Sequence, residues 1–262
     1  MTETPSSLAA ASIAELRAIH DRLAGAVAGL PADRLTAPSG AAEWTVADVL
    51  SHLGSGAEIS RYPVLAAAGA PEEAPANQDV WDRWNALPPA DQASGFVASD
   101  ERLVATYEGL SAEQRESAQV DLGFLPQPVP LATALGMRLN EAALHGWDVE
   151  VGLDPAAALS EESAALLASH FAETMTFLLG FVGKPEGAPE ARVALGEHSI
   201  VVGSEGVRLE PGTDGATAKF DGPLEAGIRL MAGRLKPAYT PPGVTVSGDI
   251  TLDDLRKVFP GY

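Results

Sequence analysis

Two ionisable side chains, Glu141 and His145, stand four residues apart in a segment whose apolar residues recur at helical spacing. Residues four apart on a helix lie one turn above each other, so this carboxylate and imidazole can reach one cation. A solvated or hydrogen-bonded surface pair is the alternative. Asp148 follows on the same stripe and is a candidate to orient His145 through its second ring nitrogen. A surface or helix-end carboxylate is the alternative for Asp148.

His52 offers a second imidazole from a separate predicted helix. The apolar residues at 46, 49, 50 and 53 form one stripe, and His52 lies at the margin of this buried face. Helical bundles commonly hold metal sites built from side chains on facing helices. His52, Glu141 and His145 are therefore the predicted metal ligands.

Three nitrogen and oxygen ligands leave at least one coordination position open. An open position is typical of catalytic zinc, whereas structural zinc is usually closed by four ligands and rich in cysteine. Zinc is the first choice for two histidines and a glutamate, and nickel, iron(II) and manganese stay open as alternatives. The open position would hold water, a substrate oxygen or a thiolate.

Charge and composition exclude several classes of partner. The chain has 262 residues and a formal charge of -19, from 36 acidic and 17 basic residues. This charge repels phosphate groups, so we expect no nucleic-acid partner and no membrane partner. Cysteine is absent, so a thiol in the chemistry must come from a cosubstrate. We find no signal-peptide pattern and no membrane-spanning apolar segment, and we expect a cytoplasmic protein.

Helical periodicity covers most of the first 180 residues. We expect helices over residues 7–30, 44–53, 80–84, 90–110, 131–151 and 160–182. Thr45 and Asp48 form a possible capping box at the start of the second of these helices. The pattern predicts an up-and-down four-helix bundle as a first domain, residues 1–182. Trp44 and Trp147 are expected to pack within this bundle, and His20, His170 and His198 to be surface or core residues.

The pattern changes after residue 182. A Gly- and Pro-rich stretch at residues 183–189 indicates a linker. Beyond it we expect strands at residues 192–195, 199–202, 207–210 and 244–247, and helices at residues 222–235 and 251–259. These elements predict a small α+β C-terminal domain, residues 190–262. The predicted fold class is α+β, mainly α.

Three segments resemble the mycothiol-dependent maleylpyruvate isomerase family. They are W-T-V-A-D-V-L-S-H-L at residues 44–53, N-E-A-A-L-H-G-W-D-V at residues 140–149, and the tail with G-R-L at residues 233–235 and V-S-G-D at residues 246–249. The resemblance spans nearly the whole chain. It implies a DinB-like metal-binding bundle followed by a small C-terminal domain.

The resemblance also implies roles for single residues. His52, Glu141 and His145 match the family's metal ligands. Arg234 is the best match to an arginine that the isomerase uses from its C-terminal domain, and it would hold a substrate carboxylate. Arg229 is the alternative match, and a solvated arginine at a helix end is the alternative interpretation of Arg234.

The function that the resemblance implies is that of a metal-dependent enzyme with mycothiol as cosubstrate. A thiolate would be added to a small electrophilic substrate, in an S-transferase or an isomerase reaction. A non-catalytic small-molecule binding or resistance protein and a metal-dependent hydrolase are the alternatives. We expect a monomer, with a dimer as the alternative.

Overall fold

The computed structural model describes residues 5–261. The chain divides into two compact units, Met1–Ala157 and Ala158–Tyr262, and each is described by itself. Helices dominate, and a sheet is confined to one part of each unit. The predicted fold class, α+β and mainly α, is confirmed.

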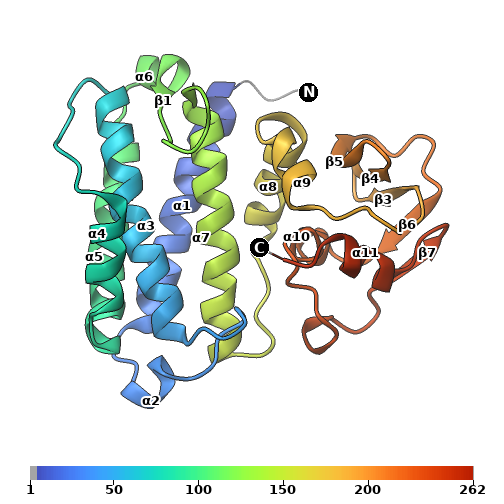
Figure 1. Ribbon diagram of the computed structural model, residues 1–262, viewed down its shortest axis with the longest axis horizontal. Coiled ribbons are helices and arrows are strands. Elements are labelled where there is room, and N and C mark those ends of the chain that lie inside the picture. Colours follow the sequence, from blue (N-terminus) through green and yellow to red (C-terminus); the bar gives the residue numbers. More distant parts are fainter. Residues whose placement is uncertain (1–4, 262) are drawn as a thin grey trace. The chain divides into compact units, whose positions relative to one another are not determined.

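Four long helices form the first unit (Figure 1). They are α1 (Pro5–Val27), α3 (Val46–Ala67), α5 (Pro89–Glu108) and α7 (Leu131–Leu153). Each contacts two of the others, which closes the ring α1–α5–α3–α7. Every helix contributes buried apolar side chains to the core of this bundle, among them Leu23, Leu53, Leu103 and Leu135. Burial of these side chains is the main force that holds the helices together.

Shorter elements connect the long helices. They are α2 (Ala32–Leu35), α4 (Asn77–Asn85), α6 (Ala112–Ser117) and the antiparallel pair β1 (Gln119–Val120) and β2 (Val129–Pro130). The return path through α4 lets α3 and α5 run in the same direction (Figure 1), which departs from simple up-and-down alternation. Gly54 allows this packing, because a Cβ there would come within 2.3 Å of the Trp84 ring on α4.

The second unit packs helices against a five-stranded sheet. Its helices are α8 (Glu161–Glu173), α9 (Thr176–Val182), α10 (Leu224–Met231) and α11 (Leu252–Val258), with a short 3-10 turn, η1 (Pro237–Tyr239). Its strands are β3 (Ala191–Leu195), β4 (His198–Gly203), β5 (Gly206–Pro211), β6 (Ala218–Asp221) and β7 (Thr245–Gly248), in the order β5-β4-β3-β6-β7. Only the β3–β6 pair among these described strands is parallel.

The structure differs from the sequence prediction between residues 158 and 190. The single helix predicted over residues 160–182 is wrong, because the chain bends by 90° between α8 and α9. Thr174 caps α8, and its hydroxyl lies 2.7 Å from Nδ1 of His170. The linker expected at residues 183–189 lies inside the second unit, because α8 contacts α10 and β5 while α9 contacts β5.

Two further findings concern strands and membranes. The strand β6 was not predicted, since its four residues include two charged side chains and make a weak pattern. Over residues 5–261, none of the individual helices combines the length and the apolar composition needed to cross a membrane. Helices α8 and α9 meet that requirement only when they are taken together across their bend.

Candidate metal centre

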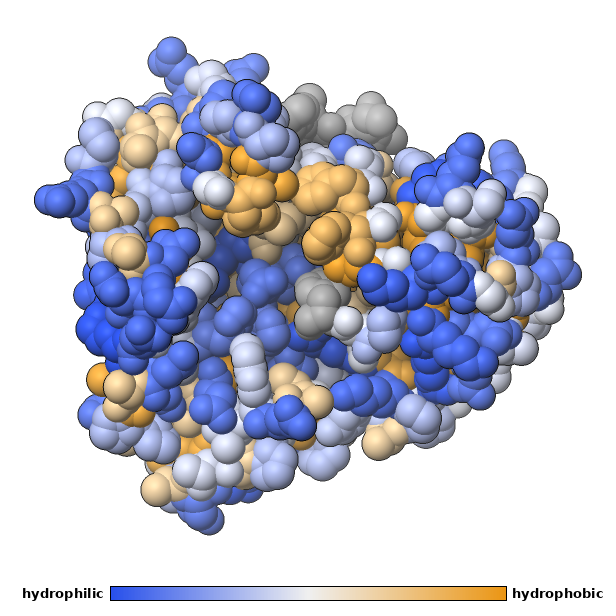
Figure 2. Space-filling model, in the orientation of Figure 1, coloured by the Kyte–Doolittle hydropathy of each residue, from blue (hydrophilic) through white to orange (hydrophobic). Residues whose placement is uncertain are grey.

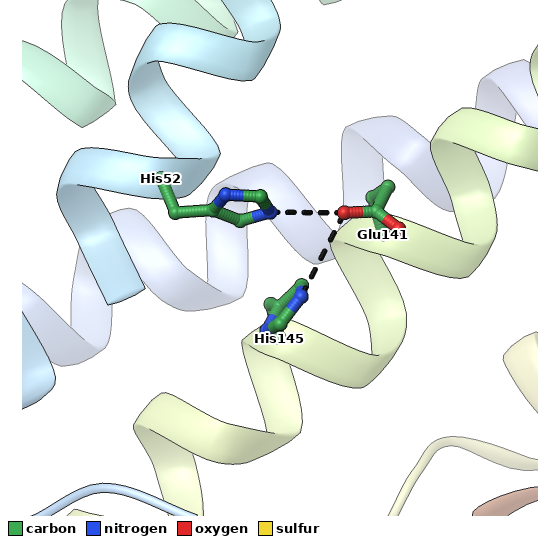
Figure 3. A group of neighbouring side chains, drawn as sticks. All are labelled: His52, Glu141 and His145. Carbon is green, nitrogen blue, oxygen red and sulfur yellow. Dashed lines mark hydrogen bonds and ion pairs between the residues drawn. The ribbon is translucent and has the colours of Figure 1, made fainter. Parts of the chain in front are cut away.

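His52 on α3 and Glu141 and His145 on α7 point toward one another (Figure 3). Nε2 of His52 lies 2.9 Å from Oε2 of Glu141, and Nε2 of His145 lies 3.7 Å from the same oxygen. One candidate ligand atom from each residue falls within 4.8 Å of the others. The three residues predicted from the sequence as ligands are therefore brought together at one point.

Local structure sets the direction of each side chain. A capping box fixes the start of α3, with the Thr45 hydroxyl accepting from the Asp48 amide and the Asp48 carboxylate accepting from the Thr45 amide. His52 follows two turns later, beside the buried Val49 and Leu53 that anchor α3 in the core. The contact between α3 and α7 then brings its imidazole to the face of α7 that carries the other two residues.

Asp148 holds His145 from the side away from Glu141. Its Oδ2 lies 3.0 Å from Nδ1 of His145, and its side chain is completely buried. A carboxylate accepts, so this contact keeps the proton on Nδ1 and leaves the lone pair of Nε2 for a cation. Gly40 covers Asp148: its amide donates to the Asp148 carbonyl at 2.8 Å, and a Cβ there would lie 2.8 Å from Oδ1.

Trp44 forms one wall of the site, although the sequence predicts that it packs inside the bundle. Its ring stacks on His145 at a centroid distance of 6.0 Å and lies 5.3 Å from the ring of His52. The side chain is 39% exposed. Trp147, in contrast, is buried as predicted, and its Nε1 donates to the Ala157 carbonyl.

The electrostatics of the site favour an ionised carboxylate. Burial acts to raise the pKa of Glu141, but the hydrogen bond to His52 and electrostatic interactions with His145, His52 and Arg138 outweigh it. The net effect lowers the pKa of Glu141 to about 2. Two imidazoles with one anionic carboxylate form a donor set that suits zinc and other borderline divalent cations. The residues present therefore fit a metal ion.

Two cavities border the site. The first, of ≈ 470 Å³, is mostly polar and is lined by Trp44, Asp48, His52, Ser55, Trp81 and Asn85. The second, of ≈ 250 Å³, contains His52 and Glu141 and has mainly apolar walls. Figure 2 shows a hollow in the face of the bundle over α3 and α7, with hydrophilic side chains on its floor. Arg138, one turn before Glu141, also lines the second cavity, and sequence reasoning missed it.

The two arginines considered for substrate binding belong to the second unit. Arg229 is buried, and its guanidinium donates to both carboxylate oxygens of Glu225 and to the Tyr239 carbonyl. These contacts assign Arg229 to the interior of the unit. Arg234 is 7% exposed and donates from Nη1 to the Ala232 carbonyl at 3.1 Å, so it is not a solvated helix-end residue. The substrate-binding role of Arg234 stays a prediction.

The remaining histidines are not among the three candidate ligands. His20 is buried on α1 and contacts Asp100, while His170 is fully buried in α8. Burial lowers the pKa of His170 to about 4. His198 lies half-buried on β4 of the second unit. All three positions agree with the surface or core role predicted for them.

The fold and the site define a helical-bundle protein with a two-histidine, one-glutamate candidate metal centre and an appended α+β unit. A family model described as the mycothiol maleylpyruvate isomerase N-terminal domain matches residues 16–150. The match covers more than half of the chain, and the chain belongs to this family. The recognition made from the sequence is confirmed, and the family bears the name of an enzyme.

Two curated proteins are similar to part of the chain. The protein named "Uncharacterized protein Rv0738" of Mycobacterium tuberculosis strain H37Rv is 30% identical over 153 residues, which cover 56% of this chain and 72% of the relative. "Uncharacterized protein MT0763" of strain CDC 1551 matches to the same extent.

Solved structures show the same fold. A crystal structure of the mycothiol-dependent maleylpyruvate isomerase matches with a TM-score of 0.61 and 18% identity, over 91% of this chain and 93% of that chain. A mutant of that isomerase matches with a TM-score of 0.62 and the same identity and coverage.

Proposed function

We propose that this protein is a metal-dependent enzyme that uses a low-molecular-weight thiol, mycothiol by family, against a small electrophile. The observation that carries the proposal is the convergence of His52, Glu141 and His145 within 4.8 Å beside two cavities. Family membership and the isomerase named for the matching structures support a thiol as cosubstrate. Zinc is the first choice of metal, with nickel, iron(II) and manganese as alternatives.

The protein's own residues supply the binding and the orientation. The two imidazoles and the Glu141 carboxylate would hold the ion, and Asp148 would keep the lone pair of His145 directed at it. A divalent cation supplies the charge that keeps a nearby thiol deprotonated at neutral pH. The ring of Trp44 lies beside both imidazoles and forms one wall of the site.

Two outcomes of thiolate attack fit this arrangement. In an isomerisation, the thiol adds to a conjugated double bond, the resulting single bond rotates, and loss of the thiol restores the double bond. In an S-transfer, the thiolate adds to the electrophile or displaces a leaving group such as chloride, the S-conjugate is the product, and the thiol is consumed. The name of the matching structures favours the isomerisation, and the absence of cysteine from the chain suits a nucleophile that comes from a cosubstrate in either case.

Measuring how much thiol is consumed during turnover tests the proposal. Zinc-loaded protein is mixed with mycothiol and either maleylpyruvate or chlorodinitrobenzene, and both free thiol and substrate are followed. We expect conversion that requires thiol, with thiol regained in an isomerisation and lost stoichiometrically in a transfer. Glu141→Gln should abolish the reaction, and His198→Ala, in the second unit, should leave it unchanged.

Two results would contradict the proposal. Turnover that is independent of thiol would indicate a metal-dependent hydrolase instead. Tight binding of these compounds without any turnover would indicate a binding protein.

A further inference from the structure

The second cavity beside the metal centre combines apolar walls with one buried cation. It has a volume of ≈ 250 Å³ and reaches both His52 and Glu141. Its apolar lining includes Val64, Tyr107, Val120, Leu122, Phe124 and Met137. A cavity of this kind fits a molecule with an apolar body, and a few polar groups then determine its orientation.

Arg138 is the cation in this cavity. It is 6% exposed, and its Nη2 donates to Oδ1 of Asp100 at 2.6 Å and to the Leu53 carbonyl at 3.3 Å. Its Nε is buried without a hydrogen-bond partner. Gly56 lies beside Nη1, where a Cβ would come to 3.4 Å, so glycine keeps the space next to this nitrogen open.

The counter-charge of Arg138 is shared. The other oxygen of Asp100, Oδ2, lies 3.0 Å from Nδ1 of His20, so one carboxylate serves both a guanidinium and an imidazole. An arginine in a buried setting is stabilised by anions that satisfy its remaining donors, and a bound carboxylate does this at Nη1. The arginine thus offers a docking point for an anion in a space whose other walls are apolar, apart from Ser60 and the two candidate metal ligands His52 and Glu141.

We propose that this cavity is the electrophile subsite and that Arg138 binds a carboxylate of a substrate that has an apolar body. That the bound molecule is an electrophile rests on the proposed function. The predicted binding of an acid in this cavity does not depend on turnover. His52 borders both cavities, so a hydrophilic thiol in the polar cavity and an apolar acid in the second cavity would meet at the same centre.

Binding of an unreactive acid tests the subsite. The probes are 3-benzoylpropionate, its methyl ester and succinate, and calorimetry on metal-free protein excludes direct binding of the carboxylate to an ion. We expect 3-benzoylpropionate to bind about tenfold or more tightly than either of the other two probes. Equal binding of the acid and its ester by the wild-type protein would overturn the proposal without the need for any variant.

Variants then identify the residue. Arg138→Met should remove the preference for the acid, and Arg138→Lys should retain part of it. Because Arg138→Met leaves the buried Asp100 without its guanidinium, the double variant Arg138→Met/Asp100→Asn keeps the test valid if the single variant does not fold. Arg102→Met, on the exposed side of α5, is the matched control and should bind like the wild type. An unchanged preference in a folded Arg138→Met variant would overturn the proposal.

The wall of the cavity is tested separately. Phe124 lines the cavity and is 67% exposed, so Phe124→Ala should fold and should weaken the binding of 3-benzoylpropionate. Unchanged binding would mean that the acid sits elsewhere and would overturn the assignment of the cavity. Selective binding of the acid without thiol-dependent turnover would support the subsite and contradict the proposed function. Thiol-dependent turnover without a preference for acids would support the proposed function and contradict the subsite.

Discussion

His145 is held between two carboxylates with different tasks. Glu141 lies on the Nε2 side of the His145 ring, which also faces His52, whereas the buried Asp148 contacts Nδ1 on the other side. The buried carboxylate fixes the tautomer and the direction of the ring before any ion arrives. At the residue scale, the site therefore depends on a group that need not touch the metal.

Replacing Asp148 with asparagine tests this dependence. Asp148→Asn removes the charge but keeps the shape, so we expect zinc affinity to fall about 10–100-fold with little loss of helix. Competition with a chromogenic chelator measures the affinity. Asp154→Asn, at the exposed end of the same helix, is the matched control and should bind zinc normally. An Asp148→Asn variant with wild-type zinc affinity would show that Asp148 does not orient His145 for metal binding.

His20 makes part of the stability depend on pH. The hydrogen bond to Asp100 raises its pKa above the ordinary value, and Glu101 adds to this, while burial and Arg17 act in the opposite direction. A raised folded-state pKa contributes stability that is fully present below the unfolded pKa and is lost as pH rises through the folded value. We therefore expect His20→Gln to cost more free energy of unfolding at about pH 6 than at about pH 9.

His170 provides the control with the opposite sign. Burial lowers the pKa of His170 to about 4. The neutral imidazole therefore contributes stability above about pH 6.5, and the wild-type protein loses this stability as pH falls toward 4. The cost of His170→Gln should shrink over that range, as urea unfolding at several pH values would reveal. Costs of His20→Gln that do not vary with pH would contradict the assignment of His20.

At the scale of elements, glycine decides how closely α4 approaches α3. Gly54→Ala should push the Trp84 ring away and lower the free energy of unfolding by about 1–3 kcal/mol. Gly25→Ala, on an exposed face of α1 with nothing within 4 Å of the new Cβ, should raise it by up to about 1 kcal/mol. Denaturant unfolding of both variants measures the difference. An increase in the free energy of unfolding for both variants would show that helix propensity, rather than packing, dominates at residue 54.

Local signals in the sequence were enough to predict most of the helices. The capping box at Thr45 lies where the pattern indicated, because it involves only residues three apart. The bend between α8 and α9 could not be predicted, since both sides are apolar and a single helix fits the periodicity. The parallel course of α3 and α5 also depends on tertiary packing of α4, which leaves no periodic signal.

The same distinction applies to the site. The spacing of Glu141 and His145 indicated a shared face, and the structure brings His52 to it. Trp44 was misjudged because its direction depends on the loop before α3, which hydrogen-bonds through Gly40 to the distant carbonyl of Asp148. Arg138 was missed because its relation to the cavity arises from α5 and the β1–β2 segment, far away in the sequence.

For the whole molecule, the division of the chain into two units places the candidate metal ligands in one unit and Arg234 in the other. The candidate ligands, Asp148 and both cavities belong to Met1–Ala157, and the predicted Arg234 belongs to Ala158–Tyr262. The formal charge of -19 gives the surface a field that attracts cations and disfavours phosphate-rich partners. These properties suit a metal-binding protein that acts on small molecules.

Metal stoichiometry tests directly whether His52, Glu141 and His145 bind one metal ion. Protein purified without chelator, and its variants His52→Ala, Glu141→Gln and His145→Ala, would be analysed for bound metal and titrated with zinc and nickel. We expect about one equivalent of metal in the wild-type protein and a large loss of affinity in each variant, because three ligands share one ion. A wild-type protein that takes up neither metal, or variants that bind as tightly as the wild type, would contradict this expectation.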